Sequence, residues 1–298
     1  MKFQSAMEYL TTYGLAIFAI LIALILLYGL GVFSGSNYVP KASPGSCIVQ
    51  KNSYGGSSLR GDCLGAIPEY ATALSGAGSV TISSFTAINE IDNGQPFSVS
   101  AWIYPTSFTT CENNVLSSSV GGVSSFTNLF SFGVTGIGNT GGITWGPPRI
   151  MFELWDSTHN QNTLMGATTL NPNNWYFIAG TYSGSSVTLY LNGQQDNTFA
   201  FGVTNSGSIP LTINKGYGFC NGHINGIVSN IQIYNASLSS NSILALYKEG
   251  IGGSPIDLQN IIGWWPLNGD TKDYSGNNGN GVGTNLAFVN DYPLPPSS

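Results

Sequence analysis

The chain has 298 residues, a net charge of −6, and only 7% Asp, Glu, Lys and Arg, against about a quarter in average soluble proteins. Glycine alone accounts for 39 residues, and Ser, Thr and Asn are also abundant. A surface of this kind has no basic patch to neutralise phosphates, so the composition excludes a nucleic-acid partner. The 15 Tyr, 15 Phe and 6 Trp are sufficient for a large core.

The N-terminal segment joins a polar stretch, residues 4–10, to an uncharged apolar run over residues 14–33. About 20 apolar residues suffice for a helix to cross a bilayer, whereas a cleaved secretory signal has an apolar run of only about 7–15 residues. The sequence therefore predicts that residues 1–35 are kept as a transmembrane helix. The single basic Lys2 before the run places the N-terminus inside and the remaining chain outside.

Beyond this helix, residues 36–46 are rich in Gly, Ser and Pro and predict a linker to a head over residues 47–298. Alternating apolar and polar residues then recur at short intervals, with no long helical pattern between them. The sequence therefore predicts a mainly β head, an antiparallel jelly-roll β-sandwich. The expected strands cover residues 97–104, 149–155, 175–182, 187–191 and 227–234, with a tight turn at Asn192-Gly193 that leads into a further strand.

One short helix is expected inside the head. Ser239 or Ser240 can cap residues 241–249, and Gly250 ends them. The apolar residues of this segment would dock on the sandwich.

Four cysteines, Cys47, Cys63, Cys111 and Cys220, contain no C-x-x-C spacing, which disfavours a zinc site. An even number of cysteines in a domain that lies outside the membrane predicts two disulfides, formed in an oxidising compartment. Pairing Cys47 with Cys63 would close a short loop, and pairing Cys111 with Cys220 would tie two distant loops. The sequence leaves all three connectivities open.

Several motifs of the head resemble the laminin-G-like, concanavalin A-like sandwich family. They are Trp175-Tyr-Phe-Ile-Ala-Gly-Thr-Tyr182, Leu189-Tyr-Leu-Asn-Gly193, the strand and turn over residues 226–235, and Phe97-Ser-Val-Ser-Ala-Trp-Ile-Tyr-Pro105. The resemblance implies that fold and a head that binds carbohydrates or proteins.

The order of elements departs from the family. The Trp-containing strand and the Asp-x-Ser-Gly-Asn loop that usually open the domain come last here, over residues 263–270 and 273–281. We expect residues 264–267 and 281–288 to complete the sandwich of their own chain as a permuted C-terminal strand. The alternative is that they complete the sandwich of a neighbouring subunit.

The N-terminus, with Gln4-Ser-Ala-Met-Glu-Tyr-Leu-Thr-Thr-Tyr-Gly before a long apolar helix, resembles the class III signal of archaeal type IV pilin-like proteins. The resemblance implies cleavage before Gln4 by a prepilin peptidase and assembly with identical or related pilin subunits. Glu8 would then neutralise the freed amine of an adjacent subunit in a filament core. Phe3 stands where the family prefers Gly or Ala.

No catalytic constellation is expected in the head. A glycosidase needs two carboxylates about 5–9.5 Å apart, but Glu153 and Asp156 are three residues apart on a strand and point to opposite faces. The two histidines, His159 and His223, have no nucleophilic partner nearby in the sequence. The sequence therefore predicts a protein that is not an enzyme.

Three further site predictions concern a cation, a glycan attachment and sugar stacking. Asp270, Asp273 and Asn277 could hold the Ca²⁺ that laminin-G-like domains often carry, or could simply organise the Ser-Gly-Asn turn. Asn235 begins a glycosylation sequon, although the family often has Asn there for structural reasons. Exposed aromatics such as Trp145, Trp155 or Tyr217 could stack on sugar rings, or could pack in the core.

Together these features predict a pilin-like surface protein, anchored in the cell membrane or assembled in an extracellular filament. Its head would be displayed outside for adhesion to glycans or cell-surface proteins. Two alternatives are a membrane-anchored lectin that does not assemble and an anchored glycan-active enzyme.

Overall fold

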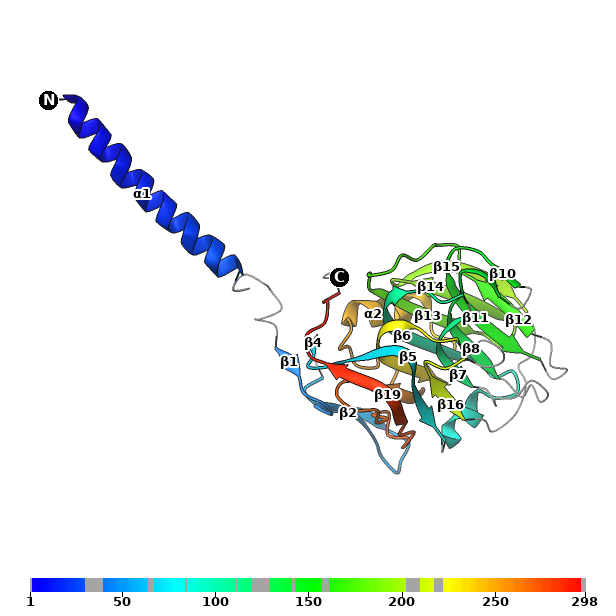
Figure 1. Cartoon of the computed structure of the whole chain (residues 1–298). Helices are drawn as coiled ribbons and strands as arrows, with labels where there is room; N and C mark the ends of the chain where they lie inside the picture. The colour runs from blue at the N-terminus through cyan, green and yellow to red at the C-terminus, as the bar shows by residue number, and fades with distance from the viewer. Residues whose placement is uncertain are drawn as a thin grey trace. The chain divides into compact units, whose positions relative to one another are not determined.

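The computed structural model describes residues 2–29, 40–63, 67–83, 85–110, 112–118, 129–140, 143–156, 161–201, 210–216 and 222–295. The chain forms two compact units, Met1–Pro40 and Lys41–Ser298 (Figure 1).

The first unit contains helix α1, Lys2–Gly29, so the helix predicted near the N-terminus is confirmed. Its described apolar side chains are exposed, among them Leu15 at 69%, Phe18 at 62% and Ile25 at 68%. Within the described residues, no helix combines the length and the apolar character that crossing a membrane requires.

The second unit, the head, is built almost entirely of β-strands. The described strands are β1 Lys41–Ala42, β2 Cys47–Lys51, β3 Ser57–Gly61, β4 Ile67–Pro68, β5 Ala71–Ile82, β6 Phe97–Ser107, β7 Asn113–Ser118, β8 Phe130–Val134, β9 Gly138–Thr140, β10 Ile143–Trp145, β11 Ile150–Trp155, β12 Gln161–Met165, β13 Tyr176–Tyr182, β14 Ser186–Leu191, β15 Gln194–Ala200, β16 Leu211–Ile213, β17 Asn225–Tyr234, β18 Ile261–Trp265 and β19 Val282–Val289. A 3₁₀ helix, η2 Thr86–Ile91, and helix α2, Ser240–Glu249, complete the head.

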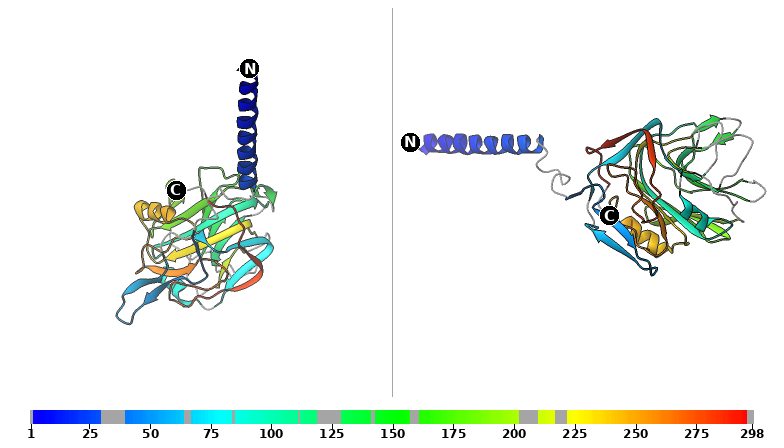
Figure 2. Two further views of the ribbon diagram at one scale, coloured as in Figure 1. Left: turned by 90° about the vertical axis from the view of Figure 1, so that its left-hand side faces the viewer. Right: turned by 90° about the horizontal axis from the view of Figure 1, so that it is seen from below.

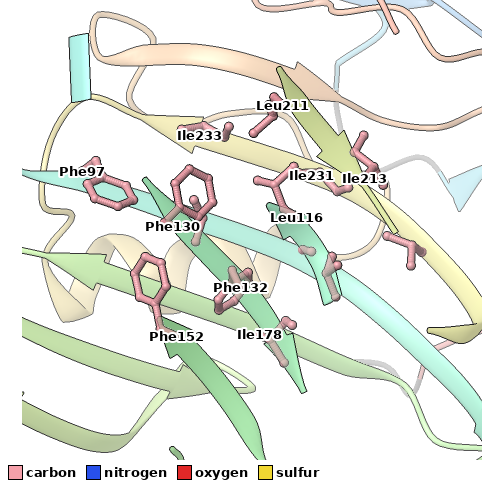
Figure 3. Packing of buried hydrophobic residues seen from close by; sticks show 14 of the residues in the cluster. Phe97, Leu116, Phe130, Phe132, Phe152, Ile178, Leu211, Ile213, Ile231 and Ile233 are labelled. Carbon is pink, nitrogen blue, oxygen red and sulfur yellow. The ribbon is translucent and has the colours of Figure 1, made fainter. Parts of the chain in front are cut away.

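The main sheet follows the order β12-β11-β8-β7-β16-β5-β17-β6-β13-β14-β15. Its two halves face each other, because rings from β6 in one half contact rings from β8 and β11 in the other. The Phe97 ring lies 5.4 Å from that of Phe130 and 5.6 Å from that of Phe152, between centroids (Figure 3). The predicted antiparallel sandwich is therefore confirmed, and strands β12 and β15 stand at the two ends of this strand order.

Helix α2 covers the outer face of β6, β13 and β14. Ser239 caps it by accepting a hydrogen bond from the Ser242 N–H, and Gly250 ends it at a φ of 79°. Tyr247 stacks on Trp102 of β6, with ring centroids 5.6 Å apart. The predicted helix, its capping serine and its terminal glycine are thus confirmed.

The C-terminal segment completes the sandwich of its own chain. Strand β18 pairs with β17, and β19 pairs with β5 along Ala71–Thr81, so that red β19 lies beside cyan β5 in Figure 1. This arrangement confirms the intramolecular alternative. Strands β18 and β19 begin and end within a few residues of the two ranges that were predicted for them.

The head begins earlier than its predicted start at residue 47. Lys41–Ala42, part of the predicted linker, pair in parallel with Ile67–Pro68. Next comes the hairpin of β2 and β3, closed at its base by a disulfide between Cys47 and Cys63 and projecting from the sandwich in Figure 2. One of the two predicted disulfides is therefore present in the described residues. Cys111 and Cys220 lie outside them.

Candidate functional site

The two edge strands of the sheet, β12 and β15, approach each other at one side of the sandwich. The Asn197 side-chain amide of β15 donates to the backbone oxygen of Met165 in β12, at 2.8 Å. The Asp196 carboxylate accepts hydrogen bonds from the Ala167 N–H at 2.9 Å and from the Thr168 N–H at 3.1 Å. The two strands therefore run in opposite directions here, and continuing this antiparallel run by two residues from the Asn197–Met165 contact brings Phe199 level with Thr163.

An aromatic pair marks the β15 side of this edge. Phe199 lies opposite Val187, which is fully buried in the core, so the two side chains share the inner face of the strand pair. Phe199 is nevertheless 61% exposed, because it lies at the open edge of the sandwich. Its ring centroid is 6.0 Å from that of Phe201, which packs against the core. The edge therefore presents an exposed aromatic ring, Phe199, that a neighbouring ring holds against the core.

Polar side chains mark the β12 side. Gln161 and Thr163 are exposed and lie on the outer face of β12, beside the fully buried Glu153 of β11. Glu153 Oε1 accepts hydrogen bonds from Gln161 Nε2 and from Thr163 Oγ1, the latter at 3.1 Å. We call Gln161, Thr163, Phe199 and Phe201, with Glu153 beneath them, the β12–β15 rim.

The polar row continues inward across the same face of the sheet. Ser131 of β8 lies directly opposite Glu153, and its hydroxyl donates to Asn114 Oδ1. Asn114 Nδ2 donates in turn to Glu112 Oε2, at 3.4 Å. Burial raises the pKa of the Glu112 carboxyl, and the hydrogen bond from Asn114 acts in the opposite direction. The polar row therefore has an acidic side chain at each end, Glu153 at the rim and Glu112 at the far end.

A recess lies beside the disulfide and is lined by Asn230, Gly253 and Trp264, among others. Its volume is about 40 Å³, and one water needs roughly 10–15 Å³ measured in the same way. The recess therefore has room for a few water molecules, but a sugar ring needs far more space. The β12–β15 rim is the better candidate for a site.

The candidate catalytic residues that the structure describes come from two parts of the chain, β11 with its end and the segment before β17. Glu153 is buried in β11, and Asp156 is half-buried just beyond the end of the strand. His223 is half-buried, and His159 lies outside the described residues.

The residues predicted for Ca²⁺ form a hydrogen-bonded turn. The Asp273 carboxylate accepts from the backbone N–H groups of Trp264, Ser275 and Gly279 at 2.8–3.0 Å. Asn277 Nδ2 donates to the Ile262 oxygen at 2.7 Å, and Asp270 Oδ2 accepts from the Tyr274 hydroxyl at 2.7 Å. N–H donors directed at both Asp273 oxygens fit the turn-organising alternative and do not fit a cation site. In the part of the chain that is described, no three His, Cys, Asp or Glu side chains are grouped to hold a metal.

The remaining predicted residues fall in varied places. The side-chain nitrogen of Asn235, where a glycan would attach, donates to Glu90 Oε2 at 2.6 Å. Trp155 is 2% exposed, which favours packing over sugar stacking. Tyr217 lies outside the residues that the structure describes, and so does the side chain of Trp145. Phe3, Gln4 and Glu8 lie in α1.

The sequence predictions missed the rim. Its signal was present as the alternation Gln161-Asn-Thr163 before Leu164 and as Phe199-Ala-Phe201. Nothing in the sequence indicated that these two edge strands meet, because Thr163 and Phe199 are 36 positions apart and β12 and β15 stand at opposite ends of the strand order.

Comparison with known proteins agrees with the fold. The laminin G-type family model described as the concanavalin A-like lectin/glucanases superfamily matches residues 74–244. No curated protein sequence matches the chain.

Many solved structures are similar to the chain, and two of them are described here. The first belongs to a Bacteroides ovatus protein described as carbohydrate binding. It has 17% identity and a TM-score of 0.56, and the match covers 78% of this chain and 63% of that one. The second is a heptameric SAP-like pentraxin from Limulus polyphemus, with 12% identity, a TM-score of 0.50 and coverage of 78% and 99%. Since the family model spans more than half of the 298 residues, the chain belongs to the concanavalin A-like lectin/glucanases superfamily.

Proposed function

We propose that the head is a glycan-binding module and that its ligand docks at the β12–β15 rim. The observation that carries the proposal is that two edge strands that approach each other expose an aromatic ring on one strand, Phe199, and hydrogen-bonding side chains on the other, Gln161 and Thr163. A sugar presents C–H faces to rings and hydroxyls to polar groups, so it needs both kinds of contact. The Bacteroides ovatus protein of similar fold, described as carbohydrate binding, supports the same class of ligand.

The rim is suited to this role because its parts are held from behind. Phe201 and the core support Phe199, and the buried Glu153 holds Gln161 and Thr163. Side chains ordered before the ligand arrives lose less conformational freedom on binding. A glycan that passes over the β12 edge would contact the ring on one side and the polar groups on the other.

Binding of a panel of neutral and acidic oligosaccharides to the full-length chain tests this proposal. Phe199→Ala should weaken binding about tenfold, since one aromatic contact contributes about 0.5–1.5 kcal/mol beyond its buried area. Tyr54→Ala removes an aromatic ring that is 96% exposed at the tip of the β2–β3 hairpin, and it should leave binding unchanged. Equal binding by both variants and the wild type would place the ligand elsewhere.

We also propose that the head binds glycans without cleaving them. Glu153, the acid that an anchored glycan-active enzyme would need, is fully buried, and its Oε1 already accepts two hydrogen bonds. Such a group supports its neighbours better than it protonates a leaving group. Release of reducing ends from any bound oligosaccharide, abolished by Glu153→Gln, would contradict this proposal.

A second proposal concerns α1. We infer that it anchors the head at the cell surface and assembles with identical or related pilin subunits after cleavage before Gln4 by a prepilin peptidase, as the N-terminal resemblance implies. The exposed apolar side chains of α1, such as Leu15 and Phe18, need an apolar environment. The alternative is an anchored lectin that does not assemble.

N-terminal sequencing of protein purified from its native cells distinguishes these alternatives. A chain that begins at Gln4 supports the pilin-like role, and a chain that still begins Met1-Lys2 contradicts it. If Glu8 neutralises a freed amine in a filament core, Glu8→Ala should reduce filament yield without reducing secretion.

A further inference from the structure

The position of Glu153 is unusual for an acidic side chain. It lies in the middle of β11, between Phe152 and Leu154 of the core, and its side chain is 0% exposed on the outer face of the sheet. Removing a carboxylate from water is costly unless hydrogen bonds compensate, and an apolar side chain of similar volume is often at least as stabilising in such a place. Stability alone therefore gives little reason for an acid here.

The hydrogen bonds of Glu153 point to another reason. Gln161 Nε2 and the Thr163 hydroxyl both donate to the same oxygen, Oε1, and both belong to the exposed edge strand β12. Gln161 Nε2 also lies 3.4 Å from Thr163 Oγ1 and can donate to it. Glu153 therefore acts on the part of the molecule that solvent or a ligand can reach.

These bonds determine which polar atoms the rim offers. One hydrogen of the Gln161 amide and the hydrogen of the Thr163 hydroxyl are engaged with the buried oxygen, and the second amide hydrogen is directed at Thr163 Oγ1. The Gln161 carbonyl oxygen and the second lone pair of Thr163 remain for contacts above the sheet. The exposed side chains of β12 thus offer acceptors, and a partner must supply the donors.

The surrounding charges favour the same kind of partner. The polar row beneath the rim runs through Ser131 and Asn114 to a second acid, Glu112. The chain has only 8 Lys and Arg against 14 Asp and Glu. An anionic group at the rim would therefore meet acceptor atoms, on a chain whose net charge is −6.

We propose that Glu153 is a positioning residue that makes the β12–β15 rim selective for neutral, hydroxyl-donating glycans over glycans with carboxylate or sulfate groups. The inference rests on the proposed glycan-binding function. Hydroxyls donate readily to exposed acceptors, whereas carboxylates and sulfates can only accept.

The test uses full-length protein and two matched ligand series, neutral hexose oligosaccharides and hexuronic acid oligosaccharides of equal length. The wild type should bind the neutral series at least about tenfold more tightly, the expected effect of roughly 1.4 kcal/mol of mismatched hydrogen bonding. If neither series binds, and sulfated oligosaccharides do not bind either, the proposed function itself fails. Equal or tighter binding of the acidic series overturns only the selectivity.

Variants then test the role of Glu153. Glu153→Gln keeps the shape of the side chain but introduces an amide that can donate, so the preference for neutral ligands should fall severalfold. Glu90→Gln, a matched change at an exposed site away from the rim, should preserve the preference. A Glu153→Gln protein that folds and keeps the wild-type preference overturns the positioning role.

If Glu153→Gln does not fold, Thr163→Val and Gln161→Met at exposed positions test the same point. Each removes one acceptor from the rim and should weaken binding of the neutral series severalfold, with little change for any acidic ligand that binds. Wild-type affinity for the neutral series in both variants would overturn the inference.

Discussion

At the scale of single residues, the core depends on the absence of a side chain at one position. Gly180 lies in the middle of β13, and a Cβ atom placed there would come within 2.7 Å of Cδ1 of Phe152 and 3.4 Å of Cε2 of Phe132. The aromatic cluster between the two halves of the sheet packs directly onto the backbone at this point. Aromatic rings of this size reach optimal contact only because the strand leaves them the space.

Gly180→Ala should therefore lower the free energy of unfolding by about 1–3 kcal/mol, the usual effect of adding a methyl group to a packed core. Denaturant unfolding measures the change. Gly146→Ala is the matched control, since a Cβ atom there meets nothing within 4 Å, and it should unfold as the wild type does. Equal stability of the two variants would mean that the phenylalanine rings can move to make room for the methyl group without a loss of stability.

Buried tyrosines give the head a defined response to alkaline pH. Burial, with a further contribution from the neighbouring Asp270, raises the pKa of Tyr274 well above its ordinary value of 10.0. Burial also raises the pKa values of Tyr234 and Tyr292. The folded state thus holds protons that the unfolded state releases above pH 10, so the stability that these groups contribute is complete below that pH and declines above it.

We expect the free energy of unfolding to fall steeply as the pH rises above 10, with a smaller fall in Tyr274→Phe. Denaturant titrations between pH 8 and about 11 measure both slopes. Tyr54→Phe, at a residue that is 96% exposed, should keep the wild-type slope. Identical alkaline slopes for Tyr274→Phe and the wild type would contradict the assignment.

At the scale of elements, the stability of the β2–β3 hairpin depends on the Cys47–Cys63 disulfide. The stability of the sandwich depends on it less. Most of its side chains are at least partly exposed, and Val49 is its one fully buried residue among those described. The Val49 N–H donates to the Tyr274 oxygen at 2.9 Å, and Lys51 Nζ donates to Asn277 Oδ1 at 3.0 Å. The bond from Cys47 to Cys63 closes the base of an element that buries little apolar surface.

The double variant Cys47→Ser, Cys63→Ser should lose up to about 3 kcal/mol, the value expected for a loop of about 15 residues. The loss should be local, so trypsin should cut at Lys51 and Arg60 before it cuts the sandwich. Limited proteolysis followed by mass spectrometry shows the order of cleavage. First cuts elsewhere, or wild-type resistance of the hairpin, would show that non-covalent contacts are enough to hold it.

At the scale of the whole molecule, strands far apart in the sequence make one sandwich. Strand β19 pairs with β5 across roughly 200 residues of chain, and Leu286 packs against the core. The Trp175 indole donates to the Pro293 oxygen at 2.6 Å, which ties the C-terminal segment to the start of β13. By contrast, residues 1–40 form a compact unit of their own.

Removal of residues 282–298 should therefore abolish cooperative unfolding of the head, because it exposes the edge of β5 and part of the core. Removal of residues 1–40 should leave the thermal midpoint of the head within a few degrees of the full-length value, since stability changes below about 1 kcal/mol shift it by only about 2–4 °C. Calorimetry of the two truncated chains compares these effects. A head that unfolds cooperatively without β19 would contradict the role given to that strand.

The sequence by itself determined the local elements of this protein. Alternation of apolar and polar residues indicated β6, β11, β13, β14 and β17, since side chains on a strand point alternately to opposite faces. The turn at Asn192-Gly193, with φ angles of 49° and 76°, followed from the two residue types that tolerate a left-handed backbone. The cap at Ser239 and the end at Gly250 followed from hydrogen-bonding needs at helix ends.

Only the tertiary structure decided which of these elements meet. Strand β7, Asn-Asn-Val-Leu-Ser-Ser, shows no alternation and β16 has only three residues, so the local pattern did not indicate them, and they form because neighbouring strands satisfy their backbone groups. The rim depends on two edge strands that have no local sequence relation. Glu153 holds Gln161 and Thr163 within the neighbouring pair β11–β12, but the exposed Phe199 comes near that pair only because β15 approaches β12 over a long range, which local propensities do not encode.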